Sequence, residues 1–250
     1  MNRQFDKRKR PASKREGPGR PQGRSVTRAQ ILDAAEGLFA EKGYAGTSLR
    51  EIADHACVTQ ALLNYYFGSK EGLFIEVYMR RGKELASQRM EGLEELRQSG
   101  KPYALDDVIR AFIQPALTMR SSPSGRQFIK LQARVHIEAD DLAYSLRREV
   151  YDESTKAYVN EIERIVPHLT QETIYWRLVQ FIGSYLYLIS DAHRLRELSA
   201  GESDPDDDAE FLRQVMSYSV GAFLAADPAQ PALKPSNAPP PRPRVRTHTA

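Results

Sequence analysis

One short segment of the sequence carries side chains suited to reading DNA bases. Within QALLNYYF, residues 60–67, we expect Gln60, Ala61, Asn64 and Tyr65 to face solvent. Gln and Asn can each form a bidentate pair with adenine, and a small residue such as Ala61 can contact a thymine methyl group. The segment therefore predicts contact with base edges in the DNA major groove.

Residues with hydroxyl or cationic groups flank this segment. Such groups bind phosphate oxygens and set the position of a protein on a duplex, but they carry no sequence information. The flanking candidates for DNA contact are Thr47, Ser48, Arg50, Thr59 and Lys70. Together with Tyr65, they predict a phosphate-binding rim around the base-reading segment.

Two short helices joined by a tight turn are expected to position these residues. Ser48, with a glutamate three residues later, matches a capping box and opens a helix that ends near Cys57. Thr59 can cap the next helix, over residues 60–66, and a glycine follows it. The apolar residues that would hold the pair together are Leu49, Ile52, Ala53, Val58, Leu62 and Leu63. This layout is typical of a helix-turn-helix, although ordinary capped helices show the same local signals.

The rest of the folded part also shows helical periodicity. Thr27 and Gln30 match a capping box for a helix that Gly43 stops, and Ser69 can cap one that continues past Tyr78. Further helices are expected over residues 105–119, 126–139, 143–166, 171–198 and 206–225. No segment alternates apolar and polar residues as a strand would, so the predicted fold class is all-α.

The helices group into a small unit followed by a larger one. We expect a three-helix helix-turn-helix domain over residues 26–72 and a helical effector-binding and dimerisation domain over 73–226. Residues 1–25 are expected to form a disordered basic arm, and residues 227–250 a disordered proline-rich tail.

Charge is concentrated in the tails. The net charge is +3, yet the first 28 residues contain ten Lys and Arg against two acidic residues. A basic arm on an acidic body suits contact with a polyanion at one end of the molecule. A solvated tail that aids solubility explains the same composition equally well.

The sequence lacks the signals that mark membrane proteins, secreted proteins and enzymes. The longest apolar run, residues 178–189, is too short and too polar to span a membrane. The absence of a signal peptide and the single cysteine, Cys57, favour the cytoplasm. No P-loop, dinucleotide-binding glycine pattern or nucleophile elbow is visible, so we expect neither catalytic residues nor a cofactor. The spacing around His136 and His193 does not suit a metal site.

The segment over residues 28–74 closely resembles the DNA-binding domain of the tetracycline-repressor (TetR) family. The similarity is carried by TSLREIADHACVTQALLNYYFGSKEGLF at residues 47–74, and it covers about a fifth of the chain. It implies a homodimeric DNA-binding transcriptional regulator. It also implies that Gln60, Ala61, Asn64 and Tyr65 face DNA, and that Lys70 binds a phosphate.

The sequence departs from the family pattern at two positions. Cys57 occupies a turn position where glycine is usual, which raises the question of a positive φ angle there. Its thiol is expected to be a small buried group rather than a redox centre. Asn64 stands where a phosphate-binding tyrosine is common, so Tyr65 or Tyr66 is expected to make that contact.

The resemblance also gives the basic arm a role. In this family, such extensions precede the first helix and follow the DNA backbone or enter the minor groove. The residues that would then lie nearest the duplex are Arg20, Arg24 and Arg28. Their contribution is expected to be nonspecific and salt-dependent.

A long apolar segment predicts a dimer. Residues 174–189 are apolar nearly all the way round a helix, so two sides must be covered. One side can pack on its own domain and the other on a partner, together with the last helix. The expected interface residues are Trp176, Phe181, Tyr185, Val215 and Ala222. A core helix in a monomer is the alternative.

The resemblance places an effector pocket among the middle helices. The candidate lining residues are Phe112, Phe128, His136, Tyr144 and Tyr151, although aromatic residues at helical spacing more often form a core. The predicted function is a sequence-specific regulator, a repressor released from a palindromic operator by a small molecule. The alternative is an architectural DNA-binding protein without an effector.

Overall fold

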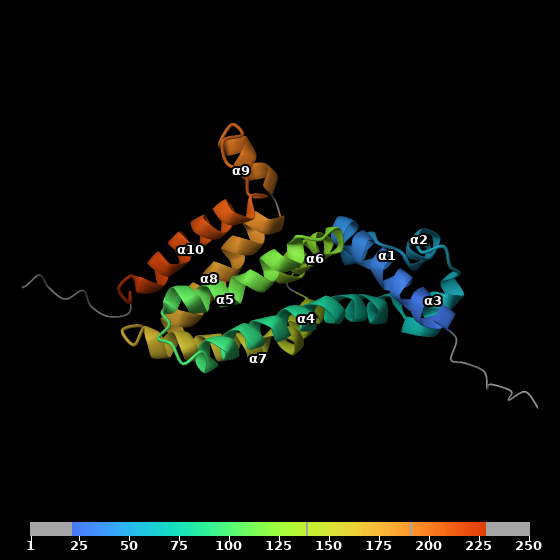
Figure 1. Cartoon of the computed structure of the whole chain (residues 1–250). Coiled ribbons are helices and arrows are strands. Elements are labelled where there is room, and N and C mark those ends of the chain that lie inside the picture. The colour runs from blue at the N-terminus through green and yellow to red at the C-terminus, as the bar shows by residue number, and fades with distance from the viewer. Residues whose placement is uncertain (1–21, 139, 191, 229–250) are drawn as a thin grey trace, which may run out of the picture.

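The protein is built from helices. The computed structural model describes residues 22–138, 140–190 and 192–228, and this part contains ten helices and no strand (Figure 1). The helices are α1 Gln22–Gly46, α2 Leu49–His55, α3 Gln60–Phe67, α4 Lys70–Gln98, α5 Leu105–Arg120, α6 Pro123–Ile137, α7 Asp141–Ile165, α8 Gln171–Ser190, α9 Ala192–Leu198 and α10 Asp208–Leu224. The all-α prediction is confirmed. No helix in these ranges is long and apolar enough to cross a membrane.

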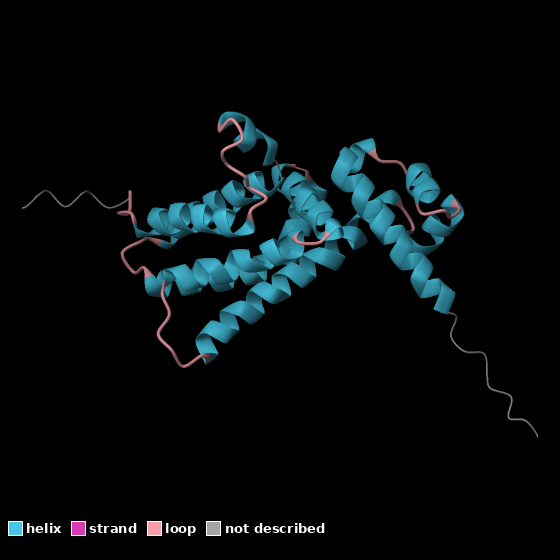
Figure 2. Ribbon diagram, turned by 45° about the horizontal axis from the view of Figure 1, so that its top comes forward, coloured by secondary structure: helices cyan, strands magenta, loops and turns pink. Residues whose placement is uncertain are grey.

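Helices α1 to α3 form a small unit at one end of the molecule (Figure 2). The predicted caps are present: the hydroxyls of Ser48, Thr59 and Ser69 accept hydrogen bonds from backbone N–H groups three residues later. Each cap satisfies a backbone N–H group that the helix itself leaves without a partner. Ile52 and Leu63 are buried in the apolar core of this unit, so the crossing of α2 and α3 is fixed by apolar packing.

The first helix starts earlier than the sequence predicts. α1 begins at Gln22 rather than at the Thr27 cap, so residues 22–25 are helical and not part of an irregular arm. Gly43 has a φ of 74° and interrupts the helix where the predicted stop lies, but a further helical segment continues to Gly46. At the other end, the predicted tail starts too early, because Asp227 is buried and accepts hydrogen bonds from Thr170 and Thr173. The remaining parts of the two predicted disordered tails, residues 1–21 and 229–250, lie outside the described residues.

The larger unit packs around α4. This helix crosses the predicted domain boundary at residues 72–73 and contacts α1, α5 and α7. A Cβ atom at Gly82 would lie 2.8 Å from Val150 Cγ1, so the glycine permits the close approach of α4 and α7. The shared helix α4 connects the small unit directly to the larger one.

The predicted helix over residues 171–198 is wrong in one respect. It is two helices, α8 and α9, and the first ends at Ser190. Residue 191, which separates the two helices, lies outside the described residues. The predicted starts and ends of α5, α6, α7 and α10 lie close to the observed ones because caps and breakers mark them.

Two groups of polar contacts tie α1 to the larger unit. The buried Glu36 carboxylate receives hydrogen bonds from Arg80 (3.0 Å) and Arg81 (3.3 Å) of α4. Arg134 of α6 donates to the carbonyl oxygens of Ala40 and Glu41, both at 3.0 Å. The end of α6 is therefore linked directly to the last part of α1.

Candidate DNA-binding surface and ligand pocket

Helix α3 presents the predicted base-reading residues to solvent. Leu63 is buried on its inner side, whereas Gln60, Ala61 and Asn64 are exposed and Tyr65 is 70% exposed. Gln60 and Asn64 are four residues apart, so they lie one above the other on the same face of the helix. The helix ends at Phe67, and the next residue, Gly68, has a positive φ of 72°, which glycine adopts readily. Two amide side chains are thus presented together on the exposed face of a short, capped helix.

The turn before α3 contains a strained residue. Cys57 has a φ of 53°, which answers the question that its position raised: the turn does require a left-handed backbone. That conformation costs a residue with a Cβ roughly 1–2 kcal/mol. The prediction of a buried thiol is wrong because Cys57 is exposed, and backbone bonds close the turn instead, such as Val58 N–H to Ala53 O at 3.0 Å.

Among the flanking candidates, Thr47 does not have a free hydroxyl. Its side chain is buried, and its single O–H is shared between the carbonyl oxygens of Gly43 (2.8 Å) and Leu38 (3.2 Å). The expected phosphate contact is therefore wrong, and the hydroxyl closes the end of α1. Ser48 and Arg50 are exposed at the start of α2.

Lys70 and Tyr66 are partly covered. Lys70 is the first residue of α4, and its ammonium group lies 4.4 Å from the centroid of the Tyr44 ring, a cation–π contact. Tyr66 is half-buried between Phe67 and Tyr65. Tyr65 is the more exposed of the two tyrosines and the better placed to reach solvent.

The expected arm residues divide into three cases. Arg28 lies in α1, pairs with Glu76 of α4 and is 5.3 Å from the Phe67 ring centroid, and its side chain remains exposed. Arg24 lies within α1, but its side chain is not described. Arg20 falls outside the described residues.

An ion pair joins the end of α1 to α2. Lys42 and Glu51 form a hydrogen-bonded pair on the surface, which raises the pKa of Lys42 and lowers the pKa of Glu51. Because both groups are exposed, the pair contributes little to stability. It does neutralise one acidic group beside the candidate DNA-binding surface.

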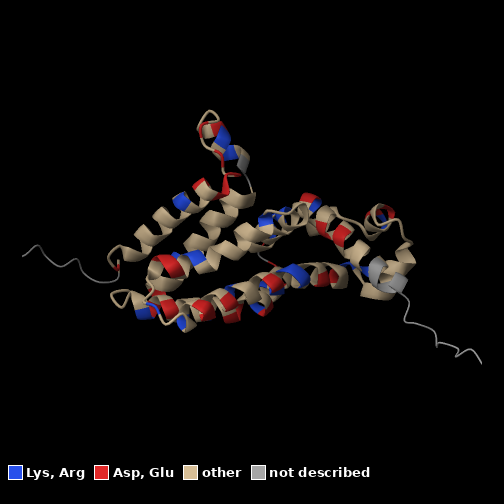
Figure 3. Cartoon of the chain, in the orientation of Figure 1, with Lys and Arg blue, Asp and Glu red and all other residues tan. Residues whose placement is uncertain are grey.

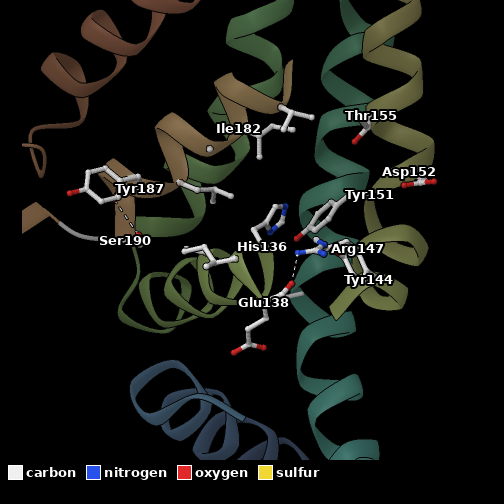
Figure 4. Close-up of a pocket in the computed structure, with 15 residues that line it drawn as sticks. His136, Glu138, Tyr144, Arg147, Tyr151, Asp152, Thr155, Ile182, Tyr187 and Ser190 are labelled. Carbon is white, nitrogen blue, oxygen red and sulfur yellow. Dashed lines mark hydrogen bonds between the residues drawn. The ribbon is translucent and has the colours of Figure 1, made fainter. Parts of the chain in front are cut away.

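A cavity lies between α6, α7 and α8 in the larger unit (Figure 4). Its volume is about 510 Å³, within the range of small-molecule sites. The predicted lining residues His136, Tyr144 and Tyr151 do line it, but Phe112 and Phe128 do not. Those two rings are fully buried in the core, where they pack against other aromatic residues. That part of the prediction is wrong.

Other lining residues were not predicted from the sequence. They are Ala133, Ile137, Glu138, Arg147, Asp152, Thr155, Val179, Ile182, Gly183, Leu186, Tyr187 and Ser190. They come from three helices that are distant in sequence, and no local pattern marks them. From the sequence alone, a charged residue on a helix is interpreted as a solvated surface group.

Burial shifts the pKa values of two side chains that line the pocket, His136 and Tyr151. Desolvation, assisted by the charges of Arg147 and Arg89, lowers the pKa of His136 to about 4. The ring is therefore neutral near pH 7, with Nδ1 2.9 Å from the Gln132 carbonyl oxygen. Desolvation also raises the pKa of Tyr151 well above its usual value, and its hydroxyl accepts a hydrogen bond from Gln132 (3.0 Å).

The outer face of α8 and α10 is apolar. Figure 3 shows few charged residues along these helices compared with α4 and α7. The large exposed apolar residues here are Tyr175, Trp176, Val179, Tyr187, Tyr218 and Leu224. A Cβ at Gly183 or Gly221 would meet nothing within 4 Å, although glycine inside a helix costs about 1 kcal/mol relative to alanine.

Only part of the predicted interface lies on this face. Trp176 is 63% exposed and Ala222 is half-buried. Phe181, Tyr185 and Val215 are at most 3% exposed because they fill the core of their own protomer. As interface residues these three are wrong, since a buried side chain has almost no surface to offer a partner.

The helix-turn-helix followed by a helical domain defines the class of DNA-binding regulators, and comparison with known proteins identifies the family. Residues 31–77 match the family "Bacterial regulatory proteins, tetR family". Residues 110–222 match "Tetracyclin repressor-like, C-terminal domain". The chain belongs to the TetR family of DNA-binding transcriptional regulators, which confirms the resemblance found in the sequence.

Individual relatives are distant. The biofilm operon negative regulator IcaR of Staphylococcus aureus is 25% identical over 139 residues, which are 50% of this chain and 69% of IcaR. The regulator Mb3439c of Mycobacterium bovis is 43% identical over 65 residues, 26% of this chain and 35% of that protein.

Solved structures share the fold. The hemolysin II transcriptional regulator HlyIIR matches with a TM-score of 0.54 and 22% identity, over 78% of this chain and 97% of that one. A tetR family protein from Shewanella sp. PV-4 matches with a TM-score of 0.55 and 19% identity, over 79% and 95%. At these identities the likeness establishes the fold alone.

Proposed function

We propose that this chain is a homodimeric repressor that binds a palindromic operator and is released by a small-molecule effector. The observation that carries the DNA-binding part is the exposed face of α3, where Gln60 and Asn64 stand together beside Ala61. Repression is supported by IcaR, which is described as a negative transcriptional regulator. The proposal places the protein in the cytoplasm with the DNA that it regulates, and it assigns no catalytic role.

In this proposal α3 enters the major groove. Gln60 and Asn64 hydrogen-bond to adenine edges, and Ala61 contacts a thymine methyl group. Phosphates are bound by Tyr65, by Lys70 and by a rim formed from Ser48, Arg50 and Thr59. The rim fixes the position of the protein, and α3 supplies the sequence preference.

The apolar face of α8 and α10 is the proposed dimer interface. Exposed apolar patches of this kind mark interaction sites, and Trp176 is the largest side chain on it. The open space beside Gly183 and Gly221 would let helices of a second copy approach closely. A two-fold dimer then presents two α3 helices to two half-sites, which is why the operator is expected to be palindromic.

The end of α6 is the proposed link between effector and DNA. His136 and Ile137 line the cavity, while Arg134, in the same turn, holds the carbonyl oxygens of Ala40 and Glu41 in α1. A ligand that displaces the end of α6 would therefore move α1 and the helices packed on it. Such a ligand lowers DNA affinity if it binds the displaced state better.

The test is selection of bound sequences from a random duplex pool at moderate salt. Wild type is compared with Gln60→Ala/Asn64→Ala and with a control, Gln98→Ala/Asn160→Ala, which changes the same residue types at exposed positions of α4 and α7. We expect a palindrome for wild type and for the control, and its loss in the α3 variant while weak salt-sensitive binding remains.

An architectural DNA-binding protein without an effector is the second candidate. It would bind many sequences alike, so the selection would enrich none. If the α3 variant selects the same palindrome as wild type, α3 is not the recognition helix and the proposal fails.

A further inference from the structure

The charged groups around the cavity are arranged unevenly. Figure 4 shows the Arg147 guanidinium pointing into the cavity, whereas the carboxylates of Glu138 and Asp152 point away from it. Asp152 is also paired with Lys156 at 3.2 Å on the outer side of α7. The charge that faces the cavity is therefore positive, although the lining contains two acidic residues.

Arg147 has capacity left for a ligand. Its Nη1 donates to the carbonyl oxygens of Val135 (2.5 Å) and Glu138 (3.1 Å) at the end of α6, and the guanidinium stacks 4.6 Å from the Tyr144 ring centroid. Among the described residues, no acidic side chain forms an ion pair with it, although its charge acts on the nearby Glu138 carboxyl and favours the ionised form. A guanidinium has five N–H donors, so bonds from one nitrogen do not exhaust them.

A second cation lies behind the cavity wall. Arg89 is 2% exposed and donates to the Tyr185 hydroxyl (2.7 Å) and the Phe112 carbonyl (3.0 Å). Its guanidinium carbon lies 5.7 Å from the centroid of the Tyr151 ring, which lines the cavity. No carboxylate pairs with it in the part of the chain that the structure describes. A buried cation without an anion is costly, so negative charge brought into this region is favoured.

The opposite side of the cavity is apolar. It is formed by Ile182 and Leu186 of α8. Ile137 of α6 and the exposed side chains of Val179 and Tyr187 line its open edge, where the cavity meets the outer face of α8. An apolar wall facing a single cationic group suits a molecule with a hydrocarbon body and one anionic end. A polar molecule with several charges would place some of them against the apolar wall of α8, where they would lose hydration without gaining a partner.

We propose that the effector is an amphiphilic carboxylate whose anionic group binds Arg147 and whose hydrocarbon body packs against α8. This inference rests on the proposed function, in which the cavity is the effector site. Arg147 is suited to the role because a guanidinium can bind a carboxylate through two parallel hydrogen bonds. The bound carboxylate would lie beside the Arg147 Nη1 bonds that hold the end of α6.

The experiment is calorimetric titration of the full chain with three probes that share a ten-carbon body: decanoate, decanol and decylammonium. We expect decanoate to bind at least about tenfold more tightly than the other two. Arg147→Gln should weaken decanoate binding at least about tenfold and leave decanol binding unchanged. The control Arg148→Gln, an exposed neighbour on α7, should bind all three probes as wild type does.

Two further measurements keep the outcomes distinct. Circular dichroism shows whether Arg147→Gln folds; if it does not, Arg147→Lys, which keeps the charge but loses the fork geometry, must retain more decanoate binding than Arg147→Ala. Equal binding of the three probes, no decanoate binding at millimolar concentration, or an unchanged Kd in Arg147→Gln would overturn the inference. Release from the operator is measured separately. If decanoate binds in an Arg147-dependent way but does not release the operator, the ligand class is supported and the proposed control of DNA binding by the effector is refuted.

Discussion

The candidate DNA-binding surface and the candidate effector pocket are built in different ways. The first is a local feature, since Gln60, Ala61, Asn64 and Tyr65 all lie on one helix of eight residues. The second is assembled from α6, α7 and α8, and its lining runs from Ala133 to Ser190. A local site depends on a helix and its caps, whereas an assembled site depends on how distant helices pack.

The two regions are joined by buried polar contacts as well as by apolar packing, and Glu36 tests that link. Glu36→Ala leaves Arg80 and Arg81 without their buried partner, and Arg80 keeps its ion pair with Asp33 (2.8 Å), so the free energy of unfolding should fall by about 2 kcal/mol. Urea denaturation followed by circular dichroism measures the change. Glu41→Ala, at an exposed position of the same helix, should have little effect; equal losses would show that the Glu36 contacts are not special.

A substitution at Trp176 tests whether the larger unit, which contains the pocket, also forms the dimer that brings two DNA-binding units together. Trp176→Asp places a charge on the apolar face of α8, and the dimer should weaken by at least about thirtyfold, as expected for an interface anchor. Sedimentation velocity at several concentrations gives the dimer dissociation constant. Leu198→Asp, an equally exposed apolar residue on α9, serves as the control. A monomeric wild type would refute the interface.

His136 distinguishes the pocket from the exposed α3 surface by its response to pH. Its pKa is about 4 in the folded chain and about 6.5 when unfolded, because burial and the charges of Arg147 and Arg89 disfavour the cation. The unfolded chain therefore binds the extra proton first, so this contribution is present above pH 6.5 and is lost as the pH falls toward 4.

Between pH 8 and pH 5, the loss of stability attributable to His136 should be roughly 2 kcal/mol, and His136→Gln should remove it. Urea denaturation at a series of pH values gives the difference between variant and wild type. His55→Gln, at an exposed position of α2, should keep the wild-type dependence. Parallel pH profiles for wild type and His136→Gln would contradict the burial of the ring.

The local site was the more predictable of the two for a physical reason. The caps Ser48, Thr59 and Ser69 bond to backbone groups three residues away, so their partners can be read from spacing. The left-handed turn at Cys57 was raised as a question by the resemblance, since glycine is usual at this position of the family. The failure near this site, Thr47, involves a partner that the local pattern does not show, the Leu38 carbonyl nine residues earlier.

The larger unit was predictable in its helices but not in its surfaces. Apolar periodicity identified α8, yet it could not show which side faces the protomer core. Phe181 and Tyr185 turned inward and Trp176 outward, which depends on how α8 packs against its neighbouring helices. The cavity residue Arg147 is recognisable only once α6 and α7 are placed together.

Cys57 gives the smallest expected effect and tests the local account. Glycine adopts the left-handed turn without the steric cost of a Cβ, but it loses more entropy on folding. Cys57→Gly should therefore raise the free energy of unfolding by only about 0.5 kcal/mol, whereas Cys57→Ala, which keeps the Cβ, should give no gain. Thermal unfolding of the three proteins measures the difference, and a less stable glycine variant would contradict the strained turn.

The most direct test of the central claim, that α3 reads the operator, is the ratio of two dissociation constants. They are measured at one salt concentration for the selected palindrome and for a scrambled duplex of the same composition. For Gln60→Ala/Asn64→Ala the account predicts at least about thirtyfold weaker binding to the palindrome and unchanged binding to the scrambled duplex. A double variant that keeps the wild-type ratio would show that the sequence is read elsewhere.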